Sequence, residues 1–590
     1  GYKYLIITTD TWDDYLTDLV EHETNRGYKA GIFLKSWITA NYGGIDEADQ
    51  IRNFIIDAYG TWDSDYVLLV GDALTTNGIP HRGMWNDAYG ENENDIPCDL
   101  YYAGLDGNWN ADGDSRWGEY SPEEADLYPE LGVGRFCVDD VSEIQNSVTK
   151  TLLYTDPPAA VRGELDEALM VGELLWSSPL TYGGTYKDQI LNGGYYDGYT
   201  TVGFFPQMPN TGTLYDRDGT WSKSTLISMM ENGLNIVNHL GHCNTQYSMK
   251  MDNSDIPSFD NDGTNHTLNF AYSQGCYNGA FDNRDPYGGY PGDCFAEEFA
   301  TDDDGAVALV MNSRYGWGDP GGTNGSSQYF DREFFDAIFG EHIYPLGDVN
   351  NDSKVDVIWA LSYGANRWCF YELNVFGDPA MRLWTREPGD LVVNHAGSIM
   401  VGQPDFDVTV YDGARGPVAG AAVTIYTDDY AIYDTGVTDA TGLVTVHPNA
   451  PDVGTLNVKV HANNFLTHDS TAEIAPAEGP YVAFDHYTVD DDMAGESAGN
   501  DNGIVNAGET IELVVTLKNV GVDPAYGVTA TLSSSSARIS LTDDTETFGD
   551  IPAGGTATCA DDYGFSVEPD ASDGETVPFT LTIQDAARTL

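Results

Sequence analysis

The first two thirds of the chain alternate strand-like and helix-like segments, and this alternation constrains the fold more than any other feature. Apolar runs typical of buried strands occupy residues 5–8, 30–34 and 66–70. Apolar positions at helical spacing fill the intervals at 13–25 and 48–59. Strands that are separated by helices in this way usually pair in parallel, so the pattern predicts a parallel sheet covered by helices.

The alternation is interrupted once and then resumes. A stretch rich in Asp, Asn and Gly at about 73–128 is predicted to form a long loop region. Residues 131–136 and 141–154 continue as strand and helix, and Pro157-Pro158 then breaks the chain. The series that follows contains a predicted helix at 224–232 and predicted strands at 168–171, 235–238, 268–272 and 306–311.

From about residue 388 the pattern changes to short strands of alternating polarity, separated by Gly, Asp and Pro turns. Segments 417–424, 444–446 and 512–517 are examples, and such spacing is typical of β-sandwiches. We therefore expect an α/β part followed by two all-β sandwiches. The predicted boundaries are 1–145 and 146–387 for two α/β subdomains, and 388–476 and 477–590 for the sandwiches.

The charge of the chain excludes several classes of partner. The 590 residues include 26 Lys and Arg against 94 Asp and Glu, a formal net charge of −68. This charge would repel phosphate backbones and anionic lipid, which argues against a nucleic-acid partner and against docking on membranes. No apolar run approaches the ~20 residues that a membrane helix needs, so no membrane insertion is expected. Solubility, a high-salt surface and calcium sites are three readings of the acidity.

Seven cysteines are spread over the chain, at positions 98, 137, 243, 276, 294, 369 and 559. No two of them have Cys-x-x-Cys spacing, so neither a zinc site nor a catalytic metal is expected. Because the number is odd, at least one thiol cannot pair within the chain. A chain of this size also needs no disulfide framework.

Two neighbouring predicted strands end in residues capable of nucleophilic chemistry. The strand at 235–240 runs into Gly241-His242-Cys243, and the strand at 268–273 runs into Gln274-Gly275-Cys276. Active sites of open parallel sheets lie beyond the carboxyl ends of the strands. There, a thiolate–imidazolium pair formed by Cys276 and His242 would attack a carbonyl carbon and later protonate the leaving amine.

The same strand ends offer backbone groups that could assist this chemistry. Gly275 has no side chain, which would let a substrate backbone approach. The N–H groups of Cys243 and Cys276 would hold the developing oxyanion. His239 lies within its strand and is expected to be a core or surface residue rather than a catalyst.

These motifs resemble the gingipain family of cysteine peptidases, which are relatives of caspases and clostripain, over residues 1–385. Gly241-His242 is similar to the family's catalytic Gly-His, and Cys276–Phe281 to its Cys-x-Asn-Gly-x-Phe nucleophile motif. Cys294–Glu298, Asn312–Trp317 and Val375–Pro379 resemble the helix start, the pocket wall and the closing motif that follow in the family. The resemblance implies a caspase-like catalytic domain of two subdomains followed by an immunoglobulin-like domain.

The resemblance also implies a Glu beside the catalytic His. Glu173, which ends the strand beginning at Ala168, is the best match, and an ordinary surface carboxylate is the alternative. Its carboxylate would orient the imidazole of His242 and stabilise the charged form of that ring. The family usually has Gly after the His, whereas this chain has Cys243, a rival nucleophile that ranks below Cys276.

The resemblance places Trp317, Tyr315, Arg314 and Gly275 at the primary specificity pocket, although a structural ion pair is an alternative role for Arg314. Gingipains specific for Arg or Lys have an Asp at the base of this pocket, but the matching stretch 181–187 contains no carboxylate. A buried cation needs a counter-charge, so the expected preference is not strictly Arg or Lys. Cleavage confined to Arg or Lys would mean that another carboxylate, such as Asp188 or Asp99, lines the pocket.

Two loops are candidates for structural calcium. The first reproduces the spacing of a twelve-residue calcium loop, with Gly113 at position six and the ligands Asn108, Asn110, Asp112, Asp114 and Glu119. The second opens the last sandwich with Asp501, Asn506 and Glu509, where a plain turn is the alternative. Residues 348–356 also alternate oxygen side chains, but Ser353 replaces the required Gly, so a helix is expected there.

Together these features predict a secreted cysteine endopeptidase that cleaves proteins or peptides through an acyl-enzyme on Cys276. A cell-surface binding protein or adhesin with an inactive peptidase domain is the alternative from another class, and a transpeptidase would share the same acyl chemistry. The chain is expected to be a monomer at an extracellular or cell-surface location. A leader or pro-segment is expected to precede the first strand.

Overall fold

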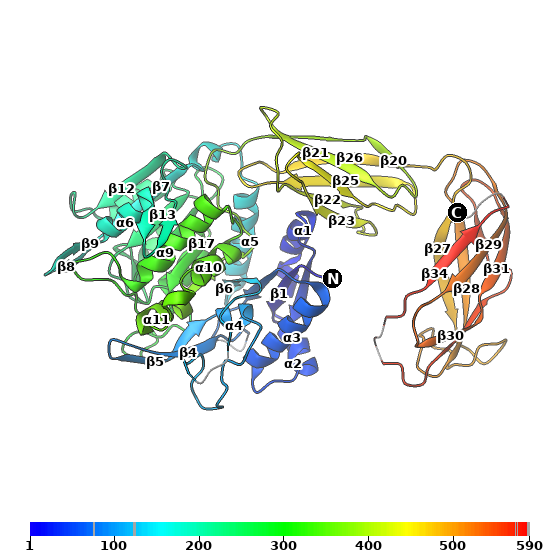
Figure 1. The fold of residues 1–590 in the computed structure, drawn as a ribbon, viewed down its shortest axis with the longest axis horizontal. Coiled ribbons are helices and arrows are strands. Elements are labelled where there is room, and N and C mark those ends of the chain that lie inside the picture. The colour runs from blue at the N-terminus through cyan, green and yellow to red at the C-terminus, as the bar shows by residue number, and fades with distance from the viewer. Residues whose placement is uncertain (75–76, 122–124, 573, 575, 587–590) are drawn as a thin grey trace. The chain divides into compact units, whose positions relative to one another are not determined.

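The structure is a computed structural model that describes residues 1–74, 77–121, 125–572, 574 and 576–586. The chain forms two compact units (Figure 1). The first comprises Gly1–Leu391 together with His461–Thr467, and the second comprises Val392–Val460 and His468–Leu590. Each unit is described below by itself.

The first unit is built on one ten-stranded sheet in the order β12-β7-β13-β16-β17-β18-β6-β3-β1-β2. All neighbouring pairs are parallel except β17–β18, so the predicted parallel α/β architecture is confirmed. Both predicted subdomains contribute to this one sheet. The strands are β1 (Tyr4–Thr8), β2 (Ala30–Leu34), β3 (Tyr66–Val70), β6 (Gly132–Phe136), β7 (Glu167–Gly172), β12 (Asn210–Tyr215), β13 (Ile236–Leu240), β16 (Asn269–Ser273), β17 (Ala306–Asn312) and β18 (Leu373–Phe376).

Both faces of the sheet are buried, each in a separate apolar core. Along β7, Ala168 and Met170 belong to one core, whereas Leu169 and Val171 belong to the other. Side chains of a strand alternate between faces, so each strand must be apolar throughout, which explains its continuous apolar run. Figure 1 shows α9 and α10 in front of this sheet.

Helices connect and cover the strands. They are α1 (Thr17–Asn25), α2 (Lys35–Asn41), α3 (Glu47–Trp62), α4 (Leu100–Ala103), α5 (Val141–Thr155), α6 (Gly183–Asn192), α7 (Lys223–Glu231), α8 (Phe295–Thr301), α9 (Ser326–Asp336), α10 (Leu346–Val355) and α11 (Gly364–Glu372). A capping box of Asp140 and Glu143 fixes the start of α5. Helix α10 covers most of the 348–356 segment, as predicted.

The predicted loop region 73–128 contains a β-hairpin, which corrects the sequence interpretation. Strands β4 (Arg82–Ala88) and β5 (Glu91–Cys98) pair antiparallel. Tyr89 and Gly90 form the turn, both with positive φ, as a tight two-residue hairpin turn requires. The first half of β5 is polar and exposed, so its residues carry no strand-like apolar pattern.

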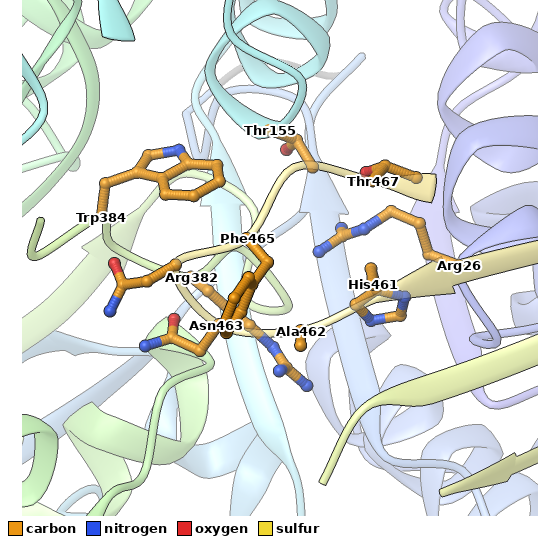
Figure 2. Close-up of a pocket in the computed structure, with 10 residues that line it drawn as sticks. Arg26, Thr155, Arg382, Trp384, His461, Ala462, Asn463, Phe465 and Thr467 are labelled. Carbon is orange, nitrogen blue, oxygen red and sulfur yellow. The ribbon is translucent and has the colours of Figure 1, made fainter. Parts of the chain in front are cut away.

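The loop His461–Thr467 belongs to the first unit although it lies within the predicted sandwich sequence. Asn464 accepts a hydrogen bond from the N–H of Thr385 at 2.8 Å, and Gly389 N–H donates to the Asn464 carbonyl at 3.0 Å. Figure 2 shows Phe465, His461 and Trp384 around a small pocket of about 30 Å³. None of the predicted site residues lines this pocket.

The second unit is all β. One group of strands forms sheets β19-β21-β24 and β20-β26-β25-β22-β23, and a second group forms β27-β28-β33-β30 with β32 at its edge and β31-β29-β34. The sheets are compatible with immunoglobulin-like sandwiches. Their strands are β19 (Leu391–His395), β20 (Ser398–Met400), β21 (Phe406–Asp412), β22 (Ala422–Tyr426), β23 (Tyr433–Val437), β24 (Leu443–Val446), β25 (Gly454–His461), β26 (His468–Ala475), β27 (Val482–Asp490), β28 (Thr510–Asn519), β29 (Ala525–Ser533), β30 (Ile539–Asp543), β31 (Thr545–Ile551), β32 (Thr556–Thr558), β33 (Tyr563–Val567) and β34 (Thr580–Gln584).

Two further features concern the described residues as a whole. No helix in the described ranges is long and apolar enough to span a membrane. All seven cysteines lie in the described part of the chain, and each has a free thiol.

Candidate active site

Three neighbouring strands of the sheet end side by side and carry the predicted catalytic residues just beyond their ends. In the register of the sheet, Leu240 pairs with Gly172 and His239 pairs with Ser273. Glu173 follows β7, His242 follows β13 and Cys276 follows β16. The sequence prediction that His242 and Cys276 stand at adjacent strand ends therefore agrees with the structure.

Cys276 is half-buried, and its thiol contacts a backbone carbonyl. The Sγ atom donates a long hydrogen bond of 3.7 Å to the carbonyl oxygen of Gly316. Burial is the main cause that raises the pKa of the Cys276 thiol to about 11. A raised pKa favours the S–H form of the thiol, and the expected thiolate–imidazolium pair of Cys276 and His242 remains a prediction.

The backbone after Cys276 is held in an unusual conformation. Tyr277 has a φ of 61°, in the left-handed region that non-Gly residues rarely adopt. Its N–H donates to the carbonyl of Arg314 at 2.7 Å, and its ring packs edge-on against Tyr315 with centroids 4.9 Å apart. These contacts hold a sharp turn of the chain directly after the proposed nucleophile. The Tyr277 N–H is bound to Arg314 and therefore cannot donate to a substrate.

His242 is exposed and is oriented by a backbone carbonyl. Its Nε2 atom lies 2.8 Å from the carbonyl oxygen of Leu175, in strand β8 (Leu174–Ser177). A carbonyl oxygen can only accept, so Nε2 carries the proton and donates it to Leu175. In the neutral ring Nδ1 then has the lone pair, which suits it to accept a proton from a thiol.

The sequence analysis predicted that Glu173 contacts His242, but Glu173 contacts His239 instead. Its Oε1 atom lies 3.1 Å from Nε2 of His239, and the side chain is buried. The partner of His242 is instead the Leu175 carbonyl, which is bound to Nε2, the ring nitrogen opposite the reacting one. His239 is buried and has partners on both ring nitrogens, consistent with the expectation of a core residue.

Gly275 leaves room for Cys243 rather than for a substrate. A β-carbon on Gly275 would lie 2.0 Å from Sγ of Cys243, so the thiol of Cys243 fills the space above the glycine. That thiol is 3.4 Å from Oγ of Ser248 and points into the protein. Burial raises its pKa far above the ordinary value, which makes it a poor nucleophile.

Two backbone N–H groups at the strand ends have no acceptor in the part of the chain that the structure describes. Among the described residues, neither the Cys243 N–H nor the Cys276 N–H donates a hydrogen bond. Both are in the segments that follow β13 and β16, next to the reactive side chains. Free donors at such a place suit an oxyanion.

A pocket of about 700 Å³ opens next to Cys276. Gly316, whose carbonyl accepts from the thiol, and Trp317 form part of its wall. The lining residues are Tyr89, Trp176, Gly316, Trp317, Gly318, Asp319, Pro320, Asn324, Gly325, Ser326, Tyr329, Tyr363 and Asn366. Of the four predicted pocket residues, only Trp317 is among them.

Arg314 and Tyr315 have other roles. Arg314 is fully buried, and its guanidinium binds both carboxylate oxygens of Asp282 at 2.9 and 2.6 Å. Arg314 therefore forms a structural ion pair with Asp282, which neutralises its charge, and it is not among the residues that line the pocket. Tyr315 packs against Tyr277 and supports the turn after Cys276.

A carboxylate that the sequence analysis did not consider lines the pocket, while the predicted cleavage preference remains a prediction. The stretch 181–187 lacks one, but Asp319 reaches the pocket from the loop after β17. Asp188 is bound to Arg217 and Asp99 to Arg135, so the two alternatives considered from the sequence are neutralised elsewhere. Among the described residues, Asp319 forms no ion pair.

Asp319, Trp176 and Tyr89 are among the pocket residues that sequence reasoning missed. Trp176 follows β7 by only four residues, and the short hairpin β8–β9 (Leu180–Tyr182) gave no separate signal. Tyr89 is at the tip of the hairpin that was taken for a loop, and its ring lies 5.2 Å from that of Trp317. A Tyr-Gly pair between two segments of similar length was the signal that could have revealed this hairpin.

The comparisons with known proteins identify the family and the fold of this chain. The family model for peptidase family C25 matches residues 1–384. The chain belongs to peptidase family C25. It is a cysteine peptidase by family, and the resemblance to gingipains is confirmed. A comparison with curated proteins found no match.

Solved structures of family C25 share the fold at low identity. The crystal structure of the Arg-specific cysteine proteinase gingipain R (RgpB) has a TM-score of 0.63 and 18% identity, covering 80% of this chain and 98% of that chain. A complex of the pro- and mature domains of RgpB from Porphyromonas gingivalis has the same TM-score and identity, covering 80% of this chain and 100% of that chain. These likenesses establish the caspase-like fold.

The first predicted calcium loop of this C25 peptidase gathers oxygen atoms. Carboxylate oxygens of Asp112, Asp114 and Glu119 lie within 4.8 Å of one another. The side-chain oxygen of Asn110 is buried without a hydrogen-bond partner among the described residues, while Asn108 accepts from the N–H of Asn110. The Arg116 guanidinium lies 3.4 Å from Glu119, and this contact would have to break for Glu119 to bind a cation.

The second predicted calcium loop is held by its own hydrogen bonds. Glu509 accepts from the Asn506 N–H at 2.8 Å and from the Asn500 side chain at 2.7 Å. Among the described residues, no hydrogen bond joins the Asp501 side chain to Asn506 or Glu509. This arrangement is that of a closed polar turn.

Proposed function

We propose that this family C25 peptidase is an endopeptidase that uses Cys276 as nucleophile and His242 as general base. The observation that carries the proposal is the hydrogen bond from His242 Nε2 to the Leu175 carbonyl, because it leaves Nδ1 as the basic nitrogen at the strand end next to Cys276. The half-buried Cys276 thiol keeps its proton until a substrate is bound.

In the proposed reaction, Nδ1 of His242 takes the thiol proton as the S–C bond to the substrate carbonyl carbon forms. The carbonyl oxygen becomes an oxyanion, which the N–H groups of Cys243 and Cys276 stabilise. The imidazolium then gives its proton to the amide nitrogen as the C–N bond breaks, and an amine leaves. Water, deprotonated by His242, hydrolyses the thioester and restores the thiol.

Asp319 supports a preference for a basic side chain at the cleaved residue. It is a carboxylate without a cation partner in the described part of the chain, and its pocket is walled by Trp317 and Trp176. A guanidinium or ammonium in this pocket would gain a counter-charge and an aromatic wall, which compensates for its desolvation. RgpB, described as Arg-specific, shares the fold at 18% identity, and the proposed preference rests on Asp319 of this chain.

Three further proposals concern the setting of the enzyme. Proteins or peptides are its substrates, and it acts as a monomer at an extracellular or cell-surface location. The loop with Asn108, Asn110, Asp112, Asp114 and Glu119 binds a structural calcium ion, because three carboxylates converge there and the Asn110 side-chain oxygen of the same loop has no hydrogen-bond partner among the described residues. The closed turn at Asp501, Asn506 and Glu509 gives less support for a second ion.

The proposal is tested with Cys276→Ala, His242→Ala and Cys243→Ala on an unstructured protein substrate. The first two variants should lose several orders of magnitude in kcat/KM, because nucleophile and base act as one unit. Cys243→Ala should remain active. Wild-type activity in Cys276→Ala, or loss confined to Cys243→Ala, would contradict the assignment. Mass spectrometry of the products distinguishes hydrolysis from transfer to an added amine.

A further inference from the structure

A buried chain of hydrogen bonds connects the three strand ends that carry the proposed catalytic residues. The ring of His239, on the central strand β13, is 0% exposed. Its Nε2 lies 3.1 Å from Oε1 of Glu173 after β7, and its Nδ1 lies 2.9 Å from Oγ of Ser273 at the end of β16. Oγ of Ser273 also accepts from the Gly275 N–H at 3.2 Å. One imidazole thus joins all three strand ends.

The direction of each hydrogen bond follows from the chemistry of the partners. An ionised carboxylate only accepts, so Nε2 of His239 carries a proton and donates it to Glu173. Burial lowers the pKa of His239, which favours the neutral ring, and in the neutral ring that donates from Nε2 the Nδ1 atom has a lone pair. The Ser273 hydroxyl, which already accepts from Gly275, therefore donates to Nδ1. The donation runs from Gly275 through Ser273 and His239 to Glu173.

The two ends of this chain lie directly beside the catalytic residues. A β-carbon on Gly241 would lie 2.3 Å from Cδ of Glu173 and 2.5 Å from Nε2 of His239. Gly241 is the residue before His242, and Gly275 is the residue before Cys276. The network therefore holds the backbone on the N-terminal side of both the base and the nucleophile.

We infer that His239 is a positioning residue, which sets the placement of His242 relative to Cys276 by bridging Glu173 and Ser273. The inference rests on the proposed function of these two residues. Only a side chain with a donor on one edge and an acceptor on another can make this bridge. Because Ser273 and His239 are fully buried, a substrate cannot reach them, and they are not a second nucleophile and base.

The test compares His239→Leu, which removes both hydrogen bonds, with His239→Gln, which keeps a donor and an acceptor. Val237→Ala, a fully buried change on the same strand outside the network, is the control for lost stability. Measurements are kcat, KM, the melting temperature and the rate of Cys276 alkylation by iodoacetamide. We expect His239→Leu to lose ~10²-fold in kcat with KM little changed, and to alkylate more slowly. His239→Gln should recover part of both losses.

The outcomes separate this inference from the proposed function. If wild type is active and Cys276→Ala is not, but His239→Leu matches Val237→Ala in kcat and alkylation at an equal loss of melting temperature, His239 has only a structural role. Equal kcat of the Leu and Gln variants, both far below Val237→Ala, would also contradict a bridging role. If Cys276→Ala is as active as wild type, the proposed function itself fails.

Discussion

The Sγ atom of Cys243 occupies the place where a β-carbon of residue 275 would be, at 2.0 Å from its ideal position. Two strand ends that carry the proposed base and nucleophile are thereby packed in direct contact. The glycine is required here for side-chain packing between strands. This relationship gives the first prediction.

Gly275→Ala should lower both stability and activity. The new methyl group would overlap Cys243, and overpacking of this kind costs about 1–3 kcal/mol of unfolding free energy. It would also separate the strand ends, so kcat should fall at least ~10-fold. The double variant Cys243→Gly/Gly275→Ala removes the overlapping atoms and should recover much of both losses. Equal defects in the single and double variants, by thermal melts and kinetics, would show that the contact is unimportant.

Alkylation of Cys276 in the free enzyme should accelerate as the pH rises above 8. The pKa of this thiol is raised to about 11 mainly by burial, so the thiolate fraction grows with each unit of pH in this range. The rate of iodoacetamide labelling, followed by mass spectrometry of the peptide containing Cys276, measures this fraction. A rate that is already constant between pH 6 and 8 would indicate a resting thiolate–imidazolium pair.

Asp319→Asn should reduce cleavage after Arg and Lys while leaving cleavage after other residues nearly unchanged. The variant keeps the shape of the pocket wall and removes its charge. Leaving a cationic side chain without its counter-charge should lower kcat/KM at least ~10-fold. Fluorogenic peptides that differ only at the cleaved residue measure the ratio, with Asp188→Asn as the control. A preserved Arg and Lys preference would exclude Asp319 as the selecting residue.

The melting temperature should fall between pH 5 and pH 8 in part because of a carboxylate cluster near the C-terminal end of α10. Oxygens of Glu341, Asp352 and Asp356 lie within 4.8 Å of one another, and no described Lys or Arg pairs with them. Burial and neighbouring carboxylates raise the pKa of Glu333 to about 8, of Asp352 to about 7 and of Asp356 to about 6.

A folded-state pKa above the unfolded value stabilises the protein at low pH, and this contribution is lost as the pH rises through the folded pKa. Asp352→Asn removes one ionising group, so its melting temperature should decline less steeply than that of wild type. The exposed Asp14→Asn variant is the matched control. Melts in EDTA at constant ionic strength make the comparison, and equal slopes for wild type and Asp352→Asn would contradict this account.

Removal of calcium should lower the melting temperature through the loop at Asn108–Glu119. A cation that binds only the folded state stabilises it, by about 2.7 kcal/mol at a hundred times the dissociation constant. Chelation should therefore destabilise the wild type and have a smaller effect on Asp112→Asn/Asp114→Asn. No shift with chelator, together with no calcium by elemental analysis, would exclude the site.

Much of the fold could be predicted because the pattern of apolar residues is local. Strands such as β3 and β17 are buried on both faces, and their apolar runs mark them directly. The polar half of β5 gave no such signal, so its hairpin was missed. The motifs around His242 and Cys276 could also be recognised, because both follow predicted strands.

The roles of single side chains depended on contacts between distant parts of the chain. Glu173 meets His239 instead of His242, and Arg314 meets Asp282 inside the protein. Asp319 lines the pocket from the loop after β17, and no pattern in the sequence indicates that this loop contributes a carboxylate to the pocket. Sheet register and burial decide which side chains meet, and both are properties of the whole packed domain.

The sequence by itself thus determined the order of strands and helices, the two residues at adjacent strand ends and the acidic character of the surface. Tertiary structure alone decided which carboxylate faces the pocket, which carbonyl orients His242 and which thiol is buried against Gly275. The physical reason is that periodicity and motifs act over a few residues. The ionisation and partners of a side chain, in contrast, are set by groups up to hundreds of positions away that packing brings within hydrogen-bond distance.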